Sequence, residues 1–349
     1  MTVRVLIVDD SKSMQQLLTV VFNSDPEIEV IGLASDASEA RTMIKSLNPD
    51  VLTLDIEMPG LNGLDFLEKI MTLRPMPVVM ISSLTKKHAA ASIKALSTGA
   101  FECLPKPIMS DDLALQHMRD VVKAAANSSA AMASNSKAKH WTSGNMPALK
   151  ADSNGPKLIL IGSSTGGVEA LGTILTTFPA DCPPTVVTQH IPEKFAASLS
   201  VRLDGVCAPN VSLAEDGKIL QPGNIYIAPG TIGHLTIIHS TVIRSRITHG
   251  PPVNGHTPSV DELFESAAKY SMGNIAAALL TGMGKDGARG LLKLKNAGAH
   301  TIAQDKQSSV VYGMPAAAIR LGAACEILPL NRIAKSLLEK KSEKVDVNL

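Results

Sequence analysis

Short runs of Val, Ile and Leu recur along the chain and alternate with segments of helical spacing. Three of these runs are "VRVLIVDD" at 3–10, "DVLTLDIEMPG" at 50–60 and "KLILIGSS" at 157–164. Such continuous apolar runs predict strands buried on both faces, which is typical of parallel sheets with helices on either side. The alternation therefore predicts a doubly wound α/β architecture.

One segment interrupts this alternation and divides the chain. Residues 123–157 are rich in Ala, Ser and Asn and show no apolar period, so they cannot bury enough surface to order themselves. A chain of 349 residues also exceeds the size at which a single hydrophobic core usually splits. We expect a first domain at 1–122 with five parallel strands, a flexible linker at 123–156 that contains Trp141, and a second α/β domain at 157–345. The strands expected in the second domain are "KLILIGSS", "PTVVTQHI", "GNIYIAPG", "HLTIIHS", "NIAAALLTG" and "HTIAQD".

Charge, apolar runs and cysteine spacing exclude several classes of protein. The net charge of +1 gives no reason to expect nucleic acid or an anionic membrane as partner. No apolar run approaches the roughly 18 residues that span a bilayer, and the N-terminus does not resemble a signal peptide. We therefore expect a cytoplasmic protein without membrane insertion. The cysteines form no CxxC pair, so neither a zinc site nor a disulfide framework is predicted; they are Cys103, Cys182, Cys207 and Cys325.

Polar side chains follow four strands of the first domain. Asp9 and Asp10 end the first strand, Asp55 the third, Ser82 the fourth and Lys106 the fifth. Ligands of open parallel sheets bind at the carboxyl ends of the strands, and three carboxylates suit Mg²⁺. An aspartate after a strand is often only a cap or turn residue, but the full set is hard to explain in that way. Together these groups could hold a phosphoryl group on one carboxylate.

The motifs "LIVDDS", "LDIEMPGLNGLDFL", "VVMISS" and "LPKP" show that the first domain resembles the receiver domain of two-component response regulators. The resemblance implies a flavodoxin-like fold in which Asp55 accepts a phosphoryl group from a histidine kinase. Ser82 would sense that group and Lys106 would pair with it. The implied Mg²⁺ ligands are Asp9, Asp10, Asp55 and the backbone carbonyl of Glu57.

One position departs from the receiver pattern. Receivers often carry an aromatic switch residue three positions before the lysine, and this chain has Cys103 there, with Phe101 two residues earlier. The departure argues against an aromatic switch but does not affect phosphorylation itself.

The first strand of the second domain leads into "GSSTGG" at 162–167. A dinucleotide site needs G-x-G-x-x-G and an acidic residue at the end of the next strand, but that strand ends in Gln189 and His190. A P-loop is excluded because no Gly-Lys-Ser/Thr follows. Residues 162–166 do fit G-x-S-x-G, a turn that exposes its central serine, Ser164, ahead of a helix N-terminus. The turn therefore favours a nucleophilic serine.

A nucleophilic serine needs a base and a group that orients the base. His190 ends the next strand, and Asp286 lies in the loop after "NIAAALLTG", so both are expected at the same sheet edge as Ser164. The order Ser, His, Asp differs from that of α/β-hydrolases and indicates a distinct fold with the same chemistry. From position alone the base stays open, because Asp-Gly pairs are common in turns and other histidines compete. These are His234, His239, His249 and His256.

The segments "IGSSTGG", "TQHI", "HTPSVDELFESAA", "LLTGMGKDGARGL" and "SSVVYGMP", together with the order receiver, linker, α/β domain, resemble the chemotaxis protein-glutamate methylesterases, the CheB family. The resemblance implies Ser164, rather than Ser163, as nucleophile, His190 as base and Asp286 as orienting carboxylate. It also implies that the backbone N–H of Met283 stabilises the oxyanion.

The activity that this resemblance implies is a phosphorylation-activated serine hydrolase. It would demethylate glutamate methyl esters and deamidate glutamines on methyl-accepting chemotaxis receptors, with no cofactor for the esterase reaction. The receiver would cover the active-site cleft until Asp55 is phosphorylated. Two alternatives remain: a receiver coupled to a nonenzymatic binding module, and a related esterase in a pathway other than chemotaxis. A nucleotide-dependent oxidoreductase is disfavoured by the missing glycine spacing and the missing acidic residue at the end of the second strand.

Overall fold

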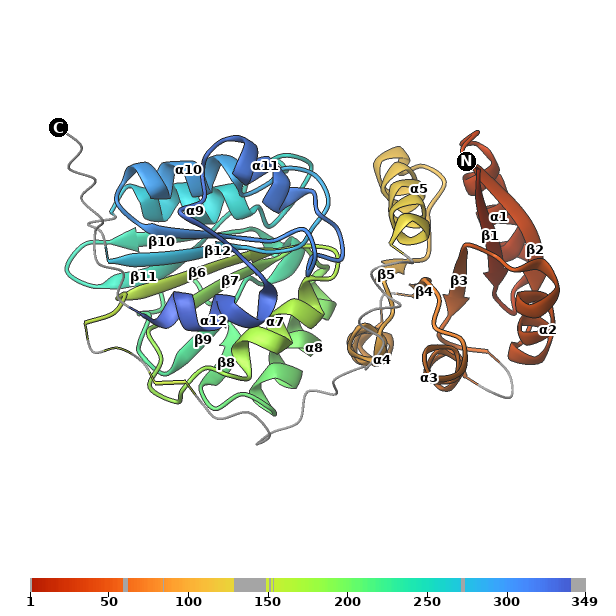
Figure 1. The fold of residues 1–349 in the computed structure, drawn as a ribbon, viewed down its shortest axis with the longest axis horizontal. Helices are drawn as coiled ribbons and strands as arrows, with labels where there is room; N and C mark the ends of the chain where they lie inside the picture. Colours follow the sequence, from red (N-terminus) through yellow and green to blue (C-terminus); the bar gives the residue numbers. More distant parts are fainter. Residues whose placement is uncertain are drawn as a thin grey trace. The chain divides into compact units, whose positions relative to one another are not determined.

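A computed structural model describes residues 2–58, 62–83, 85–128, 149–150, 152, 154–270 and 274–339 (Figure 1). Contacts between Cα atoms divide the chain into two units, 1–140 and 141–349. Among the described residues, no helix combines the length and apolar character that crossing a membrane requires.

The first unit is a five-stranded parallel sheet of order β2-β1-β3-β4-β5, which confirms the predicted sheet. Helix α1 packs against α5 on one face, and α3 packs against α4 on the other (Figure 1). The elements are β1 (Val3–Val8), α1 (Lys12–Asn23), β2 (Ile28–Ala34), α2 (Ala37–Leu47), β3 (Val51–Asp55), α3 (Gly63–Leu73), β4 (Val78–Ser82), α4 (Lys86–Thr98), β5 (Glu102–Pro105) and α5 (Asp112–Asn127).

The expected linker overlaps ordered structure at both of its ends. Helix α5 continues to Asn127, past residue 122, where the sequence analysis ends the first domain. Residues 129–148, including Trp141, lie outside the described residues. On the far side, the Leu149 N–H already donates to the Thr177 carbonyl at 3.0 Å, so Leu149 is attached to the second unit.

The second unit is a seven-stranded parallel sheet of order β14-β13-β12-β6-β7-β9-β8. The expected strand "HLTIIHS" is not part of this sheet, because β10 pairs with β11 in a separate antiparallel hairpin. Strands β8, β11 and β14 are not predicted by the apolar pattern of the sequence. The elements are β6 (Leu158–Ser163), α7 (Gly167–Leu175), β7 (Thr185–Gln189), α8 (Glu193–Asp204), β8 (Asn210–Leu213), β9 (Asn224–Ile227), β10 (His234–His239), β11 (Ile243–Thr248), α9 (Val260–Ala268), β12 (Ile275–Leu279), α10 (Ala288–Asn296), β13 (His300–Gln304), α11 (Met314–Arg320), β14 (Glu326–Leu328) and α12 (Leu330–Leu338), with a short 3₁₀ turn at Gly230–Ile232.

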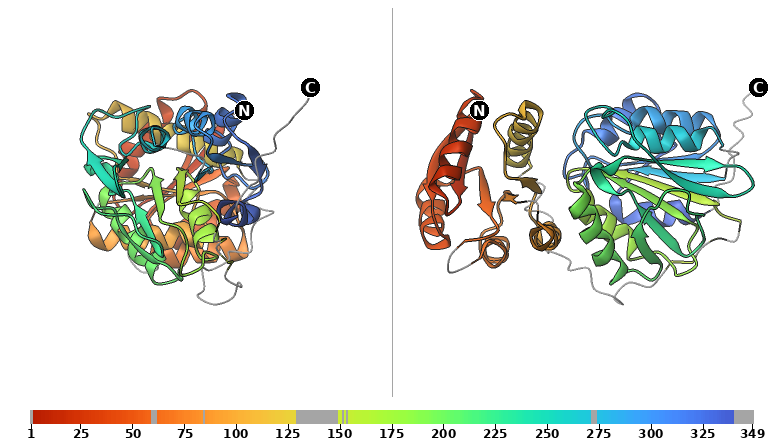
Figure 2. Two further views of the ribbon diagram at one scale, coloured as in Figure 1. Left: turned by 90° about the vertical axis from the view of Figure 1, so that its left-hand side faces the viewer. Right: turned by 180° about the vertical axis from the view of Figure 1, so that it is seen from behind.

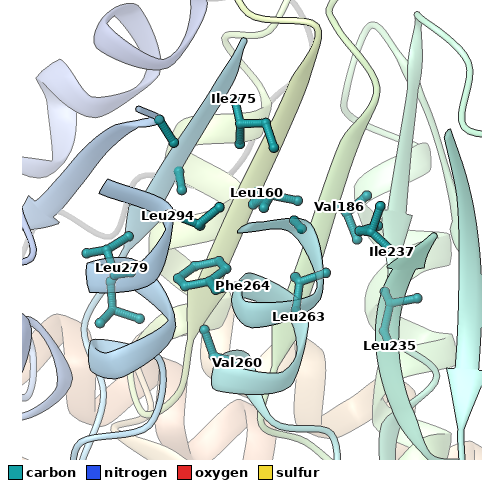
Figure 3. Packing of buried hydrophobic residues seen from close by; sticks show 14 of the residues in the cluster. Leu160, Val186, Leu235, Ile237, Val260, Leu263, Phe264, Ile275, Leu279 and Leu294 are labelled. Atoms are coloured by element: carbon teal, nitrogen blue, oxygen red, sulfur yellow. The ribbon is translucent and has the colours of Figure 1, made fainter. Parts of the chain in front are cut away.

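Helices cover both faces of this sheet, with α9, α10 and α11 on one face and α7, α8 and α12 on the other (Figures 1 and 2). Figure 3 shows how α9 sits on the sheet: Leu263 and Phe264 are fully buried over the strands, beside Leu160 of β6. Burial of each such side chain contributes about 1.5–3 kcal/mol. This packing fixes the position of α9, and therefore of its N-terminus.

Close approach of α9 requires glycine at the end of β6. A Cβ on Gly162 would lie 2.2 Å from Cγ1 of Val260, the first residue of α9. A Cβ on Gly287, which has φ +85°, would lie 2.6 Å from the same atom. Val260 is thus held between two positions that leave no space for a side chain.

We expect Gly162→Ala to destabilise the second unit by about 1–3 kcal/mol, because the added methyl group forces α9 away from the sheet. Urea unfolding of the full chain, followed by tyrosine circular dichroism, measures this, since all three tyrosines lie in the second unit: Tyr226, Tyr270 and Tyr312. The control is Gly205→Ala at the exposed end of α8, where φ is −71° and the nearest atoms are 3.7 Å from the new Cβ; it should change stability by less than about 1 kcal/mol. Equal stability of the two variants would contradict the packing argument.

Candidate active site

The strand order brings the three predicted residues of the second unit to one edge of the sheet. Strand β6 lies between β7 and β12, and all three run parallel. Ser164 follows β6, His190 follows β7, and Asp286 lies in the loop between β12 and α10. Backbone hydrogen bonds join these ends, from the His190 N–H to the Ser163 carbonyl at 3.1 Å and from the Ser164 N–H to the Thr281 carbonyl at 3.0 Å.

Ser164 stands in a tight turn between β6 and α7. Gly166 caps the helix with φ +76°, a left-handed conformation that favours glycine, and the Gly167 N–H donates to the Ser164 carbonyl at 2.7 Å. The Ser163 hydroxyl donates to Oε1 of Gln189 at 2.6 Å, and Nε2 of Gln189 donates to the Ser164 carbonyl at 2.9 Å. Gln189 therefore fastens the turn, a role that the sequence analysis missed, and the Ser163 hydroxyl serves structure.

His190 is hydrogen-bonded to Asp286. Its Nε2 lies 2.9 Å from Oδ2 of Asp286, and the His190 side chain is 6% exposed. An ionised carboxylate only accepts hydrogen bonds, so the proton is on Nε2 and Nδ1 keeps a basic lone pair. Within the described part of the chain, Nδ1 is buried and has no hydrogen-bond partner. It is therefore free to accept the proton of a nucleophile.

The Asp286 carboxylate is fully buried at the N-terminus of α9. Burial raises the pKa of the Asp286 carboxyl, but the hydrogen bond and charge of His190, with further donors, offset this and hold the pKa well below its usual range. The carboxylate therefore stays ionised and can stabilise an imidazolium. The donors other than His190 are the Ser259 hydroxyl at 2.8 Å, the Val260 N–H at 2.6 Å, the Asp261 N–H at 3.3 Å and Nδ2 of Asn254 at 2.9 Å.

A second buried carboxylate, that of Asp261, lies beside Asp286. Nδ2 of Asn254 is 2.9 Å from Oδ2 of Asp261 and 2.9 Å from Oδ1 of Asp286, so one amide bridges both acids. Burial raises the pKa of the Asp261 carboxyl, and the charge of Asp286 raises it further, against the lowering effect of the Gly290 N–H. Asn254 and Asp261 are not among the site residues predicted from the sequence. The segment that could have indicated them is "NGHTPSVD", where the Asn-Gly pair is typical of a turn and Asn254 takes φ +52°.

The competing histidines fall into two groups. The ring of His256 stacks on that of His190 with centroids 3.8 Å apart and planes at 10°, so His256 belongs to the site. His234 is buried between the Ser259 N–H at 3.1 Å and the Pro251 carbonyl at 3.1 Å, a structural role. His239 packs edge-on against Tyr270, and His249 contacts a backbone carbonyl. The hydrogen bond to Asp286 therefore distinguishes His190 from His234, His239 and His249.

The loop that carries Met283 passes close to Ser164. A Cβ on Gly282 would lie 2.7 Å from Cβ of Ser164, so only glycine permits this approach. In the described part of the chain, the backbone N–H of Met283 donates to no acceptor. A free N–H in this loop could stabilise an oxyanion, which is the role that the family resemblance implies for Met283.

The first unit gathers its predicted acidic residues at the carboxyl edge of its own sheet. Asp9, Asp10 and Asp55 each have a carboxylate oxygen within 4.8 Å of those of the other two. Nζ of Lys106 lies 2.8 Å from Oδ2 of Asp55 and 3.3 Å from Oδ2 of Asp9. Lys106 contacts two of the three carboxylates, and the excess of hard oxygen ligands fits a bound Mg²⁺.

Burial of the Asp9 and Asp55 carboxylates makes their negative charges costly, so a cation bound at this edge would stabilise them. Burial raises the pKa of the Asp9 carboxyl, and the charge of Asp55 raises it further, whereas the Ser11 N–H and Lys106 lower it. Ser82 is buried at the end of β4, and its carbonyl accepts the Lys106 N–H at 3.0 Å. Ser82 and Lys106 therefore stand at the acidic cluster, as the sequence predicts.

The position at which receivers often carry an aromatic switch residue is buried in this protein. Cys103 and Phe101 are both buried, and the Cys103 thiol contacts the Ser92 carbonyl at 3.4 Å.

Comparison with known proteins gives two matches to family descriptions and many similar chains. Residues 159–337 match the CheB methylesterase family, and residues 5–118 match the response regulator receiver domain. The chain is 51% identical over 336 residues to a protein-glutamate methylesterase/protein-glutamine glutaminase of Agrobacterium fabrum, with 96% of each chain covered. A protein of the same name from Caulobacter vibrioides is 48% identical, covering 97% of this chain and 98% of its own. The crystal structure of the Thermotoga maritima CheB methylesterase catalytic domain is 39% identical with a TM-score of 0.51, covering 52% of this chain and 97% of its own.

We expect Asn254→Gly to slow the labelling of Ser164 by a fluorophosphonate about 10- to 100-fold. Glycine accepts the backbone angle of Asn254, so the change removes only the amide bridge, and hydrogen bonds to charged groups contribute about 1.5–3 kcal/mol. Asn224→Ala, which removes an amide bonded at 2.9 Å to the Pro222 carbonyl in a remote turn, should label at the parental rate. Unchanged labelling of folded Asn254→Gly protein would mean that Asp286 is oriented without this bridge.

Proposed function

The chain belongs to the CheB methylesterase family, and on that basis we propose that it is a phosphorylation-activated protein-glutamate methylesterase and protein-glutamine glutaminase. Its substrates would be methyl-esterified glutamate and glutamine side chains on the cytoplasmic helices of methyl-accepting chemotaxis receptors. The observation that carries the proposal is the contact between His190 and the buried Asp286 beside the Ser164 turn.

In the first half of the proposed reaction, the Oγ of Ser164 attacks the γ-carbonyl carbon of the ester. Nδ1 of His190 takes the serine proton, and the Asp286 carboxylate stabilises the imidazolium that forms. The Met283 N–H donates to the oxyanion, a contribution that is usually worth about 10²–10³ in rate. The bond to the methoxy oxygen then breaks, and His190 gives its proton to the departing methanol.

In the second half, water attacks the acyl-enzyme. His190 accepts the proton of the water, the ester bond to Ser164 breaks, and the serine recovers its proton from the imidazolium. The product is a glutamate carboxylate. The same residues act on glutamine, with ammonia as the leaving group in place of methanol.

In the first unit, we assign Asp55 as the phosphoryl acceptor and a histidine kinase as the donor. Mg²⁺ held by Asp9, Asp10, Asp55 and the Glu57 carbonyl would neutralise charge on the phosphoryl oxygens. Lys106, already 2.8 Å from Asp55, would pair with the phosphoryl group, and the Ser82 hydroxyl would turn toward it. Phosphorylation can regulate the esterase only through a state that the phosphorylated receiver favours over the unphosphorylated one. We propose that this is a state in which the receiver no longer covers the esterase cleft.

We expect Ser164→Ala to reduce methanol release from methylated receptor membranes by about 10³-fold or more, as loss of a nucleophile does in other serine hydrolases. The matched control is Ser198→Ala on α8, whose hydroxyl donates to the Lys194 carbonyl at 3.1 Å and is absent from the proposed chemistry. Retention of methanol release by Ser164→Ala would exclude the serine mechanism, whereas absence of methanol release by the phosphorylated parental protein would favour a nonenzymatic output domain.

Asp55→Asn should abolish the increase in esterase rate that a small-molecule phosphodonor and Mg²⁺ produce, because the acceptor oxygen is lost. Asp65→Asn on the exposed face of α3 serves as the control and should keep the increase.

The isolated segment from Leu149 onward should release methanol from methylated receptor membranes faster than the unphosphorylated full chain does, because the receiver is absent. If it is no faster, the receiver does not inhibit.

A further inference from the structure

The loop that precedes α9 brings a second imidazole ring to the esterase site. Val253 and His256 exchange two backbone hydrogen bonds, each of 3.0 Å, around Asn254 at φ +52° and Gly255 at φ +83°. Positive φ at both central positions is characteristic of the type I′ turn, which an Asn-Gly pair favours. This turn fixes the backbone from which the His256 side chain projects.

The same loop contacts both His190 and the carboxylate that orients it. Nδ2 of Asn254 donates to Oδ1 of Asp286 at 2.9 Å, and the Ser259 hydroxyl donates to the same oxygen at 2.8 Å. The half-buried ring of His256 lies flat on the ring of His190, with centroids 3.8 Å apart and planes at 10°. One loop therefore holds the carboxylate by hydrogen bonds and the imidazole by stacking.

The hydrogen bond to Asp286 does not by itself fix the direction in which Nδ1 of His190 points. This bond holds Nε2 at 2.9 Å from Oδ2 of Asp286. Rotation about the Cβ–Cγ bond of a histidine moves Nδ1 further than it moves Nε2, because Nδ1 lies further from that axis, and this torsion has a broad minimum. Nδ1 is buried and, within the described residues, has no hydrogen-bond partner that would stop the rotation. A further contact is needed to hold the ring plane.

The ring of His256 supplies such a contact. The backbone of His190 is already attached to β6, because its N–H donates to the Ser163 carbonyl at 3.1 Å, so rotation of the side chain is the freedom that remains. A flat ring in van der Waals contact with one face of the imidazole resists tilting of its plane, and stacked aromatic rings also attract one another. The stack therefore restrains the torsion that the hydrogen bond leaves soft.

We propose that His256 is a positioning residue of the esterase, which fixes the plane of the His190 ring so that Nδ1 is directed at Ser164. The inference rests on the proposed serine mechanism and adds to it a role for the second ring. His256 exchanges no proton in this role, so a flat ring without nitrogens should replace it. A misplacement of about 1 Å between reacting groups can cost about 10²-fold in rate, which makes loss of the ring measurable.

The first test compares a variant that removes the ring with one that keeps it. In the full chain, His256→Leu should slow the labelling of Ser164 by a fluorophosphonate about 10- to 100-fold. His256→Phe keeps a flat ring and should label within about threefold of the parental rate. A parental rate in His256→Leu would overturn the proposal. A His256→Phe variant as slow as His256→Leu would overturn it as well, since the site would then need the nitrogens rather than the ring plane.

The time course of labelling separates positioning from folding. Incomplete folding leaves part of the protein unlabelled, whereas misorientation of His190 lowers the rate constant and still permits complete labelling. We expect complete labelling of His256→Leu with a reduced rate constant; a reduced final extent at the parental rate constant would contradict the positioning role. The matched control is His239→Leu, at an exposed histidine of the separate hairpin whose ring packs against Tyr270, and it should label at the parental rate.

Methanol release from methylated receptor membranes gives a second readout. His256→Leu should lower kcat and leave KM within about twofold of the parental value, because the ring acts through His190. A raised KM at unchanged kcat would assign His256 to substrate binding and refute the positioning role. The parental protein distinguishes this inference from the proposed function. If parental Ser164 is not labelled and no methanol is released, the serine mechanism itself is wrong, whereas an active parental protein with an unaffected His256→Leu variant refutes the inference alone.

Discussion

The buried charge of Asp286 is the interaction on which the second unit depends. A carboxylate removed from water is costly unless donors surround it, and here the start of α9 supplies them through Ser259, Val260 and Asp261. Those donors are held in place because the buried side chains of Leu263 and Phe264 pack α9 against the sheet. The orientation of His190 is therefore a consequence of core packing by residues that lie more than 70 positions away in sequence.

The two units differ in how the charge of their buried carboxylates is balanced. Asp286 is surrounded by fixed donors, so its charge is permanent and its surroundings need not change during a reaction. In the part of the chain that the structure describes, the cluster of Asp9, Asp10 and Asp55 has Lys106 as its counter-charge and an excess of negative oxygen. A centre of that kind is sensitive to the addition of a cation or a phosphoryl group. The charge at Asp286 is thus fixed by its surroundings, whereas the charge balance of the acidic cluster changes when a cation or a phosphoryl group binds.

Much of this arrangement could be predicted from the chain itself, for identifiable reasons. Strand ends in a parallel sheet share an edge, so Ser164, His190 and Asp286, like Asp9, Asp55 and Lys106, could be placed together from apolar runs alone.

The parts that could not be predicted depend on long-range contacts. Asn254 bridges two acids only once the loop before α9 folds back over the site, and Gln189 acts through its side chain across to β6. Strand β10 has the same apolar pattern as sheet strands, yet it forms a separate hairpin with β11, because pairing is decided by neighbours that a local pattern does not reveal.

The place of Val260 between Gly162 and Gly287 has a consequence for how such sequences can change over time. The three positions are distant along the chain but share one volume. A larger residue at Gly162 becomes acceptable only after Val260 has become smaller, whereas at Gly287 the φ of +85° and the contact with Leu279 disfavour a side chain as well. Substitutions there should occur together or not at all across divergent members of the family. A redesign of this core would have to treat the three residues as a single unit.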